Sequence, residues 1–556
     1  NNEGNPLNAM RYVFSTGDKV DSIMCSGYTA DSYKADSVSR TFIWFYIADS
    51  LPNTPGYDST IFNRKPDVIA RAQNNGIFIA QNLKPVNYRI YAIGDKNDNQ
   101  LYEPGTDMVG LLDTVYNPVK LPEFGIWFDS LRMYPSAEPQ LYFRMFTDKA
   151  FVNQRLVEAV RPEQKKAILY FNADYPRIDS LIFDNISSDK ILIDPQTDGR
   201  DTVALWFNVP AEQLPDTIKG KIVYYRHDSL RQLSKTREPL KLAWKLVETK
   251  EQEKERERIE KEKEKAAAEG REYKDPNYKN PFSLRISAGK EVNPEKGFDI
   301  TFGTPAVQLD STAVELVALD EKQNKIPVKW HLERDTLNMC RWQVKAEWKE
   351  KTAYRLYIPK RAVTDVMGYQ NDSTVVEFTT FDPEKFATVS LNVKGGKSRY
   401  IILLTDSSGK TLQELKGVKS GKYRFNYVAP GDIRLRVIED ANGNGVWDAG
   451  DVVKGLQPER AEAYFNDRGE DLFTTKMNWD FEVSLDMEKI FIPMTMENLV
   501  KMLDDKESSR LQKLYEEWLK KRSEGKDHDH SQQSSGGGMG FGGMAGGLKN
   551  ATSTFK

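Results

Sequence analysis

The sequence predicts a mostly β fold, a series of tandem β-sandwiches that ends in an amphipathic helix and a disordered tail. Aromatic residues make up 11% of the 556 residues, and aromatic and β-branched side chains favour strands. Apolar runs such as 40–48 (RTFIWFYIA) and alternating runs such as 87–93 (NYRIYAI) recur along the chain, as expected for buried and half-buried strands. The length predicts several domains.

Two internal repeats indicate how these strands are grouped. Residues 76–106 align without a gap with residues 421–451, and both copies read as strand, proline turn, strand and acidic loop. A shorter repeat relates residues 4–16 to residues 368–380, which we expect to be the last strand of a domain. Because a lone strand can neither bury its apolar face nor pair its edge, we expect the first copy to close a domain whose body lies upstream.

Changes in composition complete the expected domain map. The run after residue 247 is highly charged with almost no apolar stripe, so it is either a solvated helix or a disordered insertion. The tail is rich in glycine and methionine, which favours disorder. The expected segments are 1–17 (last strand of a truncated domain), 18–120 (sandwich with an acidic loop), 121–247 (one or more β domains), 248–280 (charged insertion), 281–382 (β-sandwich), 383–490 (second sandwich with an acidic loop), 491–526 (amphipathic helix) and 527–556 (tail).

Composition also excludes several classes of function. A net charge of −3 gives no reason to expect a nucleic-acid partner. With Cys25 and Cys340 as the only cysteines, a disulfide framework and a four-cysteine zinc site are excluded. Four histidines leave little for histidine catalysis, and His528 and His530 in the tail read as a solvated tract more readily than as a metal site. We therefore expect no catalytic residues.

The loop 440–451 (DANGNGVWDAGD) has the spacing of a calcium loop. Side-chain oxygens fall at its first, third, fifth, ninth and twelfth positions, with Gly445 at the sharp turn in position six. The expected ligands are Asp440, Asn442, Asn444, Asp448 and Asp451. An aspartate at position twelve in place of the usual glutamate predicts weak binding in a structural role. The alternative is an Asx-rich turn without metal.

The corresponding loop in the first repeat is a poorer version of the same pattern. It keeps Asp95, Asn97, Asn99 and Glu103 as candidate calcium ligands. Gln100 stands where the other loop has glycine, and Thr106 stands where the other loop has its last aspartate. A closed cage of oxygens leaves no open catalytic position in either loop.

Near the C-terminus the apolar residues change to helical spacing. The apolar stripe consists of Leu511, Leu514, Tyr515, Trp518 and Leu519. Such a stripe either caps a sandwich of the same chain or lies in the groove of a partner. The tryptophans Trp44, Trp127, Trp206 and Trp330 lie in apolar strand runs, so we expect them in cores and not on a sugar-binding face.

Three segments together resemble one family of proteins. Residues 1–32 (NNEGNPLNAMRYVFSTGDKVDSIMCSGYTADS), 76–107 (GIFIAQNLKPVNYRIYAIGDKNDNQLYEPGTD) and 437–451 (VIEDANGNGVWDAGD) are similar to Ig-like-domain outer-membrane lipoproteins of Bacteroidota. The resemblance implies that 18–120 and 383–490 are transthyretin-like sandwiches and that 281–382 is Ig-like. It also implies a lipid anchor upstream of Asn1, an outer-membrane and surface-exposed location, and no catalytic residues.

From these observations we expect a non-catalytic subunit of an outer-membrane complex that inserts or secretes proteins. Its expected partners are an outer-membrane β-barrel protein, other lipoproteins, or both. The alternative is a surface glycan-binding or adhesion protein, which would present exposed aromatic side chains on one face of a sandwich.

Overall fold

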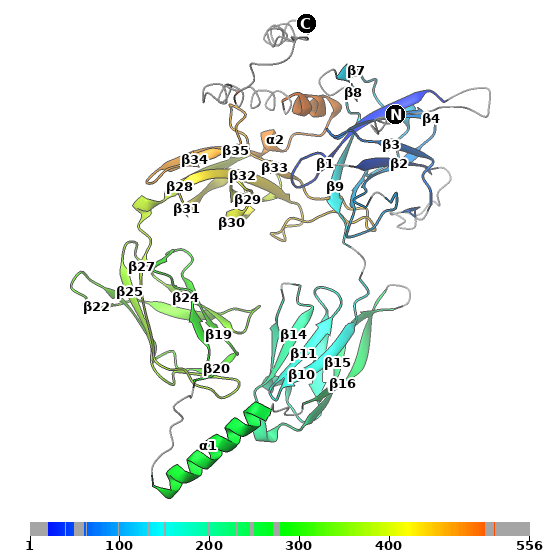
Figure 1. The fold of residues 1–556 in the computed structure, drawn as a ribbon. Coiled ribbons are helices and arrows are strands. Elements are labelled where there is room, and N and C mark those ends of the chain that lie inside the picture. Colours follow the sequence, from blue (N-terminus) through cyan, green and yellow to red (C-terminus); the bar gives the residue numbers. More distant parts are fainter. Residues whose placement is uncertain are drawn as a thin grey trace, which may run out of the picture.

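The computed structural model describes residues 21–38, 40–48, 61–62, 64–97, 99–129, 134–149, 152–197, 199–228, 232–244, 250–270, 279–505 and 516. The mostly β fold expected from the sequence is confirmed (Figure 1). Within the described residues four β domains follow one another, which we number domain 1 (21–149), domain 2 (152–244), domain 3 (279–382) and domain 4 (383–491). Domains 1 and 4 form the upper pair in Figure 1, and domains 2 and 3 form the lower pair.

Domain 1 is one seven-stranded sheet in the order β3-β2-β5-β6-β9-β1-β4. Its strands are β1 (Ile23–Asp31), β2 (Thr41–Ile47), β3 (Val68–Arg71), β4 (Ile77–Leu83), β5 (Tyr88–Gly94), β6 (Met108–Leu111) and β9 (Leu141–Thr147). The sheet curls until its ends meet, since an isolated bridge joins Ala72 to Phe78. The aromatic rings of Phe45, Phe78 and Phe143 fill the space inside.

The expected boundary at residue 120 is wrong, because β9 belongs to this sheet. It runs parallel to β1 and antiparallel to β6. Alternate residues Leu141, Phe143 and Met145 point into the domain 1 core, so the burial of these side chains fixes the strand there. Between β6 and β9 lies a separate hairpin of β7 (Ile126–Asp129) and β8 (Tyr134–Ala137).

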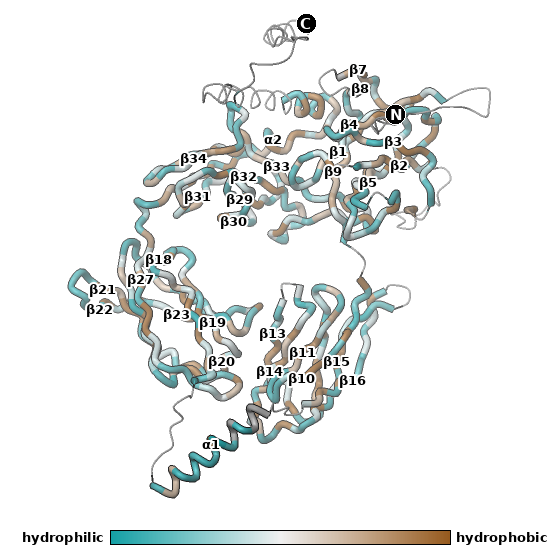
Figure 2. The backbone as a smooth tube through the Cα atoms, in the orientation of Figure 1, coloured by the Kyte–Doolittle hydropathy of each residue, from teal (hydrophilic) through white to brown (hydrophobic). Residues whose placement is uncertain are grey.

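Domain 2 is a two-layer sandwich with a core of its own. One sheet has the order β10-β11-β14-β13 and the other β12-β15-β16. The strands are β10 (Leu156–Glu163), β11 (Lys166–Phe171), β12 (Ile178–Phe183), β13 (Ile191–Pro195), β14 (Thr202–Phe207), β15 (Thr217–His227) and β16 (Leu233–Ala243). The charged insertion that follows is helical over α1 (Lys250–Ala268), which agrees with the first of the two alternatives for it. Figure 2 shows that this helix is hydrophilic along most of its length.

Domain 3 packs two main sheets, β17-β19-β24-β23 and β18-β27-β25-β21-β22, around a third core. Its last strand is β27, which lies in the second copy of the short repeat, as expected. The strands are β17 (Leu284–Ile286), β18 (Glu291–Val292), β19 (Phe298–Phe302), β20 (Ala306–Leu309), β21 (Glu315–Leu319), β22 (Lys325–Pro327), β23 (Trp330–Arg334), β24 (Arg341–Ala346), β25 (Ala353–Ile358), β26 (Val363–Asp365) and β27 (Thr374–Thr380).

Domain 4 repeats part of the topology of domain 1. The strands are β28 (Ala387–Lys394), β29 (Arg399–Asp406), β30 (Thr411–Val418), β31 (Gly421–Val428), β32 (Gly431–Asp440), β33 (Ala461–Ala463), β34 (Phe473–Thr475) and β35 (Asp480–Asp486). Strand β28 pairs antiparallel with β31 and parallel with β35, as β1 does with β4 and β9. Strand β29 pairs with β32 as β2 does with β5. The sequence repeat is therefore also a structural repeat.

After β35 the chain becomes helical. Helix α2 (Met487–Ile490) is followed by a helix over residues 496–505, whose first turn is capped by the Thr495 hydroxyl. Residues 1–17, the tail 527–556 and the apolar stripe of Leu511, Leu514, Tyr515, Trp518 and Leu519 lie outside the described residues. Among the residues that are described, no helix is both long and apolar enough to cross a membrane.

Candidate functional site at the paired acidic loops

The acidic loop of domain 4 leaves the end of β32 and is organised by buried Asp440. The Asp440 carboxylate accepts hydrogen bonds from the backbone N–H groups of Asn444 and Gly445, both at 3.0 Å. Gly445 has φ of +76°, a left-handed conformation that glycine adopts without strain. The sharp turn expected at position six is therefore present.

The other ligand candidates converge on Asp448. One of its carboxylate oxygens, Oδ2, accepts hydrogen bonds from Asn442 Nδ2 at 2.6 Å and Asn444 Nδ2 at 2.7 Å. The Oδ1 atoms of Asn442 and Asn444 each accept a backbone N–H two residues further on, which is the Asx-turn arrangement. Four of the five predicted residues thus come together around one turn.

The fifth, Asp451, points elsewhere. Its carboxylate forms an ion pair with Lys454 Nζ at 2.8 Å and accepts the backbone N–H of Lys454. Although partial burial opposes it, this contact with Lys454 holds the pKa of Asp451 below its usual value. Asp451 therefore stabilises the turn that follows the loop and does not join the other four residues.

Glu459, which the sequence analysis missed, closes the loop instead. Its two carboxylate oxygens accept the backbone N–H groups of Ala441 at 2.8 Å and Asp448 at 3.1 Å. Burial, reinforced by the nearby Asp448 charge, raises the pKa of Glu459 despite these hydrogen bonds. This residue ties the second position of the loop to the ninth.

The loop of domain 1 has the same construction. Buried Asp95 accepts the N–H groups of Asn99 at 3.2 Å and Gln100 at 2.7 Å. Asn97 Nδ2 donates to Glu103 Oε2 at 2.5 Å, as Asn442 donates to Asp448. Gln100 adopts the left-handed conformation with φ of +56°, at the position where domain 4 has glycine.

Buried Asp107 closes this first loop as Glu459 closes the second. It accepts the N–H groups of Lys96 at 3.1 Å and Glu103 at 2.8 Å. Lys96 and Glu103 occupy the same repeat positions as Ala441 and Asp448. Two carboxylates at different places in the sequence therefore make the same pair of bonds, and we call Asp107 and Glu459 the loop-closing carboxylates.

The described residues contain no group of three or more His, Cys, Asp or Glu side chains arranged to hold a metal ion. Calcium in either loop stays a prediction.

The domain 4 loop, the strand β32 before it and the segment after it pack directly on domain 1. Trp447 meets Tyr33 edge to face with the ring centroids 5.0 Å apart, and the Arg436 guanidinium lies 4.7 Å from the Tyr33 ring centroid. Val452 enters a domain 1 cluster that contains Trp44 and Phe146. This interface joins domain 4, the last of the described β domains, to domain 1, the first of them.

Hydrogen bonds fix the same contact. Gln457 Nε2 donates to the Leu111 carbonyl at 2.7 Å and to Asp113 Oδ1 at 2.9 Å. Arg144 donates to the Pro458 carbonyl at 2.8 Å. Glu459, which closes the loop, directly follows this docked segment, so loop and interface form one continuous structure.

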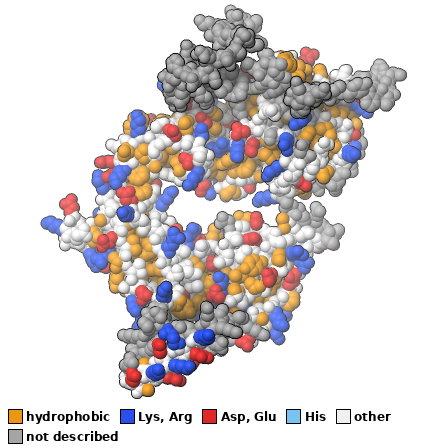
Figure 3. Space-filling model, viewed as in Figure 1, with side chains coloured by type: hydrophobic (Ala, Val, Ile, Leu, Met, Phe, Trp, Pro, Cys, Tyr) orange, Lys and Arg blue, Asp and Glu red, His pale blue; other side chains and the backbone are white. Residues whose placement is uncertain are grey.

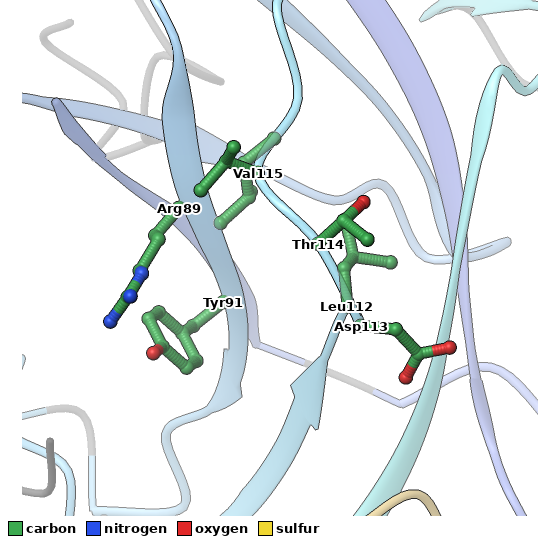
Figure 4. Close-up of a pocket in the computed structure, with 7 residues that line it drawn as sticks. Arg89, Tyr91, Leu112, Asp113, Thr114 and Val115 are labelled. Atoms are coloured by element: carbon green, nitrogen blue, oxygen red, sulfur yellow. The ribbon is translucent and has the colours of Figure 1, made fainter. Parts of the chain in front are cut away.

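A small cavity lies at the edge of this interface. It has a volume of about 140 Å³, which is below the ~300–1,000 Å³ of ordinary ligand pockets. Its lining residues are Arg89, Ile90, Tyr91, Leu112, Asp113, Thr114 and Val115. Figure 4 shows Arg89 and Tyr91 on one side of it, and Leu112, Asp113 and Thr114 on the other. This lining offers no histidine, cysteine or serine as a nucleophile or base.

The tryptophans expected in cores divide into two groups. Trp44 and Trp206 are buried, and Trp330 packs partly buried against the domain 3 core, as expected. The expectation is wrong for Trp127, which lies on the β7–β8 hairpin with 49% of its surface exposed.

Figure 3 shows that acidic and basic side chains are interspersed over the visible face, as the small net charge suggests.

Comparison with solved structures finds similar β-rich proteins from bacterial surfaces. The major pilin subunit of Bacillus cereus is 10% identical, with 83% of this chain and 98% of that chain covered at a TM-score of 0.13. SGBP-B from the mixed-linkage glucan utilization locus of Bacteroides ovatus, solved with a heptasaccharide, is 8% identical, with coverages of 76% and 90% and a TM-score of 0.14. Latent PorU of Porphyromonas gingivalis is 8% identical, with coverages of 80% and 46% and a TM-score of 0.20.

These likenesses concern β-rich architecture and carry no argument about function. No protein-family model and no curated protein sequence matches the chain.

Proposed function

We propose that this chain is a non-catalytic surface scaffold, a structural subunit of a larger outer-membrane assembly that inserts or secretes proteins. Its partners in this proposal are an outer-membrane β-barrel protein, other lipoproteins, or both, and a lipid anchor holds it at the membrane. The observation that carries the proposal is the docking of domain 4 on domain 1. A chain closed on itself in this way presents the surfaces of four domains in a fixed geometry.

Contacts between domains 2 and 3 support a rigid body. The buried Asp194 carboxylate accepts the Met339 N–H at 3.1 Å, and Lys165 Nζ donates to the Val366 carbonyl at 2.8 Å. Trp206 packs against Val366 in a small apolar cluster shared by the two domains. Buried polar and apolar contacts together oppose free rotation between domains.

The junction of domains 3 and 4 also contains packed aromatic rings and a hydrogen bond. Phe381, Phe386 and Tyr427 form an aromatic cluster with centroid separations of 4.5 to 5.9 Å. The Tyr427 hydroxyl donates to Glu350 at 2.6 Å. Each successive pair of domains from 2 to 4 is therefore in contact, and the docked segment of domain 4 returns the chain to domain 1.

An affinity pull-down from mildly solubilised membranes tests this function. We expect a β-barrel membrane protein to elute with the full-length chain in a fixed ratio, as a stable subunit requires. Elution of the chain alone would reject the stable-subunit proposal.

A second candidate is glycan binding or adhesion, which the exposed Trp127 favours, because an exposed indole stacks well on a sugar ring. Affinity electrophoresis with soluble polysaccharides separates the two candidates. Retardation that Trp127→Ala abolishes would favour the glycan-binding function, and unchanged migration on all polysaccharides would remove it.

We also propose that the domain 4 loop binds Ca²⁺ as a structural ion. Asp440, Asn442, Asn444 and Asp448 would supply oxygen ligands, with Glu459 beside them. In the described loop the Asp448 oxygen receives two amide donors, and a cation would take their place.

A further inference from the structure

The β7–β8 hairpin presents an unusual run of exposed apolar side chains. Ile126, Trp127 and Phe128 are consecutive, and 45%, 49% and 59% of their surfaces are exposed. Consecutive strand residues point to opposite faces, so both faces of this two-stranded ribbon carry apolar surface. A two-stranded hairpin is marginal without further packing, and clustered exposed apolar surface marks a docking site.

The described helix of residues 496–505 ends beside this hairpin. Its Met502 and Leu503 pack against the domain 1 cluster of Tyr28, Ala30 and Ile77, and Ile77 begins β4, the strand next to β8. Figure 1 shows the orange helix and the labels β7 and β8 at the same end of domain 1. The chain beyond Asp505 therefore starts close to the apolar ribbon.

The charges at this point agree with that placement. Burial, together with the charges of Asp505 and Glu138, raises the pKa of Asp504. Glu138 in turn accepts the Gly125 N–H at 2.7 Å, at the base of the hairpin where Ile126 pairs with Ala137. The last turn of the described helix and the base of the hairpin are therefore neighbours.

The sequence beyond Asp505 has the right length and composition to cover the hairpin. Leu511 follows Asp505 by six residues, which span about 9 Å as helix and at most about 20 Å extended. The apolar stripe from Leu511 to Leu519 would be about 12 Å long as a helix, and the four residues of β7 span about 13 Å. Glu516, the described residue within this segment, is helical.

Charge complementarity favours the flanks of the same occupant, since the stripe segment 511–519 itself holds one Lys and two Glu, a net charge of −1. Residues 506–526 contain seven Lys and Arg and four Asp and Glu, a net charge of +3. The described residues at the hairpin base include Glu138, whose charge acts on Asp504 together with that of Asp505.

We propose that residues 511–519 form an amphipathic helix whose apolar stripe docks on the β7–β8 hairpin of the same chain. Of the two alternatives for this stripe, a cap on its own chain or a helix in a partner's groove, the position of Asp505 selects the first. The proposal does not depend on the outer-membrane function, and it is an alternative to glycan binding at Trp127, which requires this hairpin to be uncovered.

Hydrogen–deuterium exchange of the full chain tests this docking with a matched pair of variants. Leu514→Asp puts a carboxylate into the stripe, and Ser509→Asp puts the same charge two residues before the proposed helix, outside the stripe. We expect amides of residues 126–137 to exchange about tenfold faster in Leu514→Asp than in the wild type, a docking free energy of about 1.4 kcal/mol. Ser509→Asp should exchange like the wild type. Unchanged exchange in the domain 1 core strands shows that both variants are folded.

Two results would overturn the proposal. If hairpin exchange is the same in all three proteins, the stripe does not cover the hairpin. If protection appears only at high protein concentration, a second copy of the chain is the occupant.

Discussion

Asp107 and Glu459 make the same two backbone hydrogen bonds in the two acidic loops, although they do not align in the repeat. The candidate ligands Asp440, Asn442, Asn444 and Asp448 were predictable, because an Asx-rich turn is a local pattern with fixed spacing. Glu459 was not predictable, because the chain first passes over domain 1 before it returns to the loop. The tertiary fold, and not the local sequence, places the Glu459 carboxylate at the loop.

Replacement of Asp107 measures what a loop-closing carboxylate contributes. Asp107→Ala leaves two backbone N–H groups without acceptors in a partly buried place, so we expect the free energy of unfolding of domain 1 to fall by about 2–4 kcal/mol. Thr106→Ala, at the exposed neighbouring position, is the control and should change it by less than about 0.5 kcal/mol. Urea denaturation followed by circular dichroism gives both values, and equal values for the two variants would contradict this role.

Asp148 predicts a pH dependence of the interface between domains 1 and 4. Burial, and then the nearby Asp451 charge, raises its pKa above the ordinary 3.8. A carboxyl with a raised folded-state pKa stabilises the fold below its unfolded pKa, and this stabilisation is lost as pH rises through the folded value. We therefore expect Asp148→Asn, which cannot ionise, to lessen the loss of stability as pH rises from about 4 to 7.

Thermal unfolding of the wild type and of Asp148→Asn across that pH range checks the sign. Parallel curves would show that Asp148 does not contribute. A steeper loss in the variant would show that its pKa is lowered.

At the scale of the element, the domain 4 loop allows a test of which aspartates bind calcium. The spacing in the sequence predicts Asp451 as a ligand, whereas the structure directs Asp451 away from the loop. With a dissociation constant of about 1 mM, 10 mM Ca²⁺ would stabilise domain 4 by about 1.4 kcal/mol. We expect Asp448→Asn to abolish this stabilisation and Asp451→Asn to keep it, because Asp451 is directed at Lys454. Calorimetry with Ca²⁺, Mg²⁺ or chelator measures the shift in Tm.

In the reverse outcome, Asp451→Asn would abolish the stabilisation by Ca²⁺ and Asp448→Asn would keep it. Asp451 would then be a calcium ligand, as the spacing of the loop predicts. No shift in the wild type would leave the loop as an Asx turn without metal.

The strands show the same limit on prediction as the loops. Alternating apolar residues and the repeat predicted β4, β5, β31 and β32, because these signals are local. The assignment of β9 to domain 1 depends on parallel pairing with β1, more than a hundred residues earlier. Nothing in the spacing of residues 141–147 indicates which sheet they join. Trp127 reads as a core residue for a related reason, since an exposed apolar ribbon has the same local pattern as a buried strand.

For the whole molecule, closure of domain 4 on domain 1 depends on the absence of a side chain at Gly450. A Cβ there would overlap the Phe146 ring and the Leu456 carbonyl. Gly289 is the matched control, because its Cβ would meet no atom closer than 3.9 Å. Neither glycine has a left-handed φ, so a valine tests the available space at each position.

We expect Gly450→Val to separate domain 4 from domain 1 and to increase the radius of gyration measured by small-angle scattering. Domain 4 keeps its own core of Val389, Leu404 and Val437, so its unfolding transition should remain while the contact with domain 1 is lost. Gly289→Val should leave the radius of gyration unchanged. An unchanged radius in Gly450→Val as well would mean that the docked segment can move away from Phe146 without opening the interface, and the rigid scaffold would then have to rest on the other domain contacts.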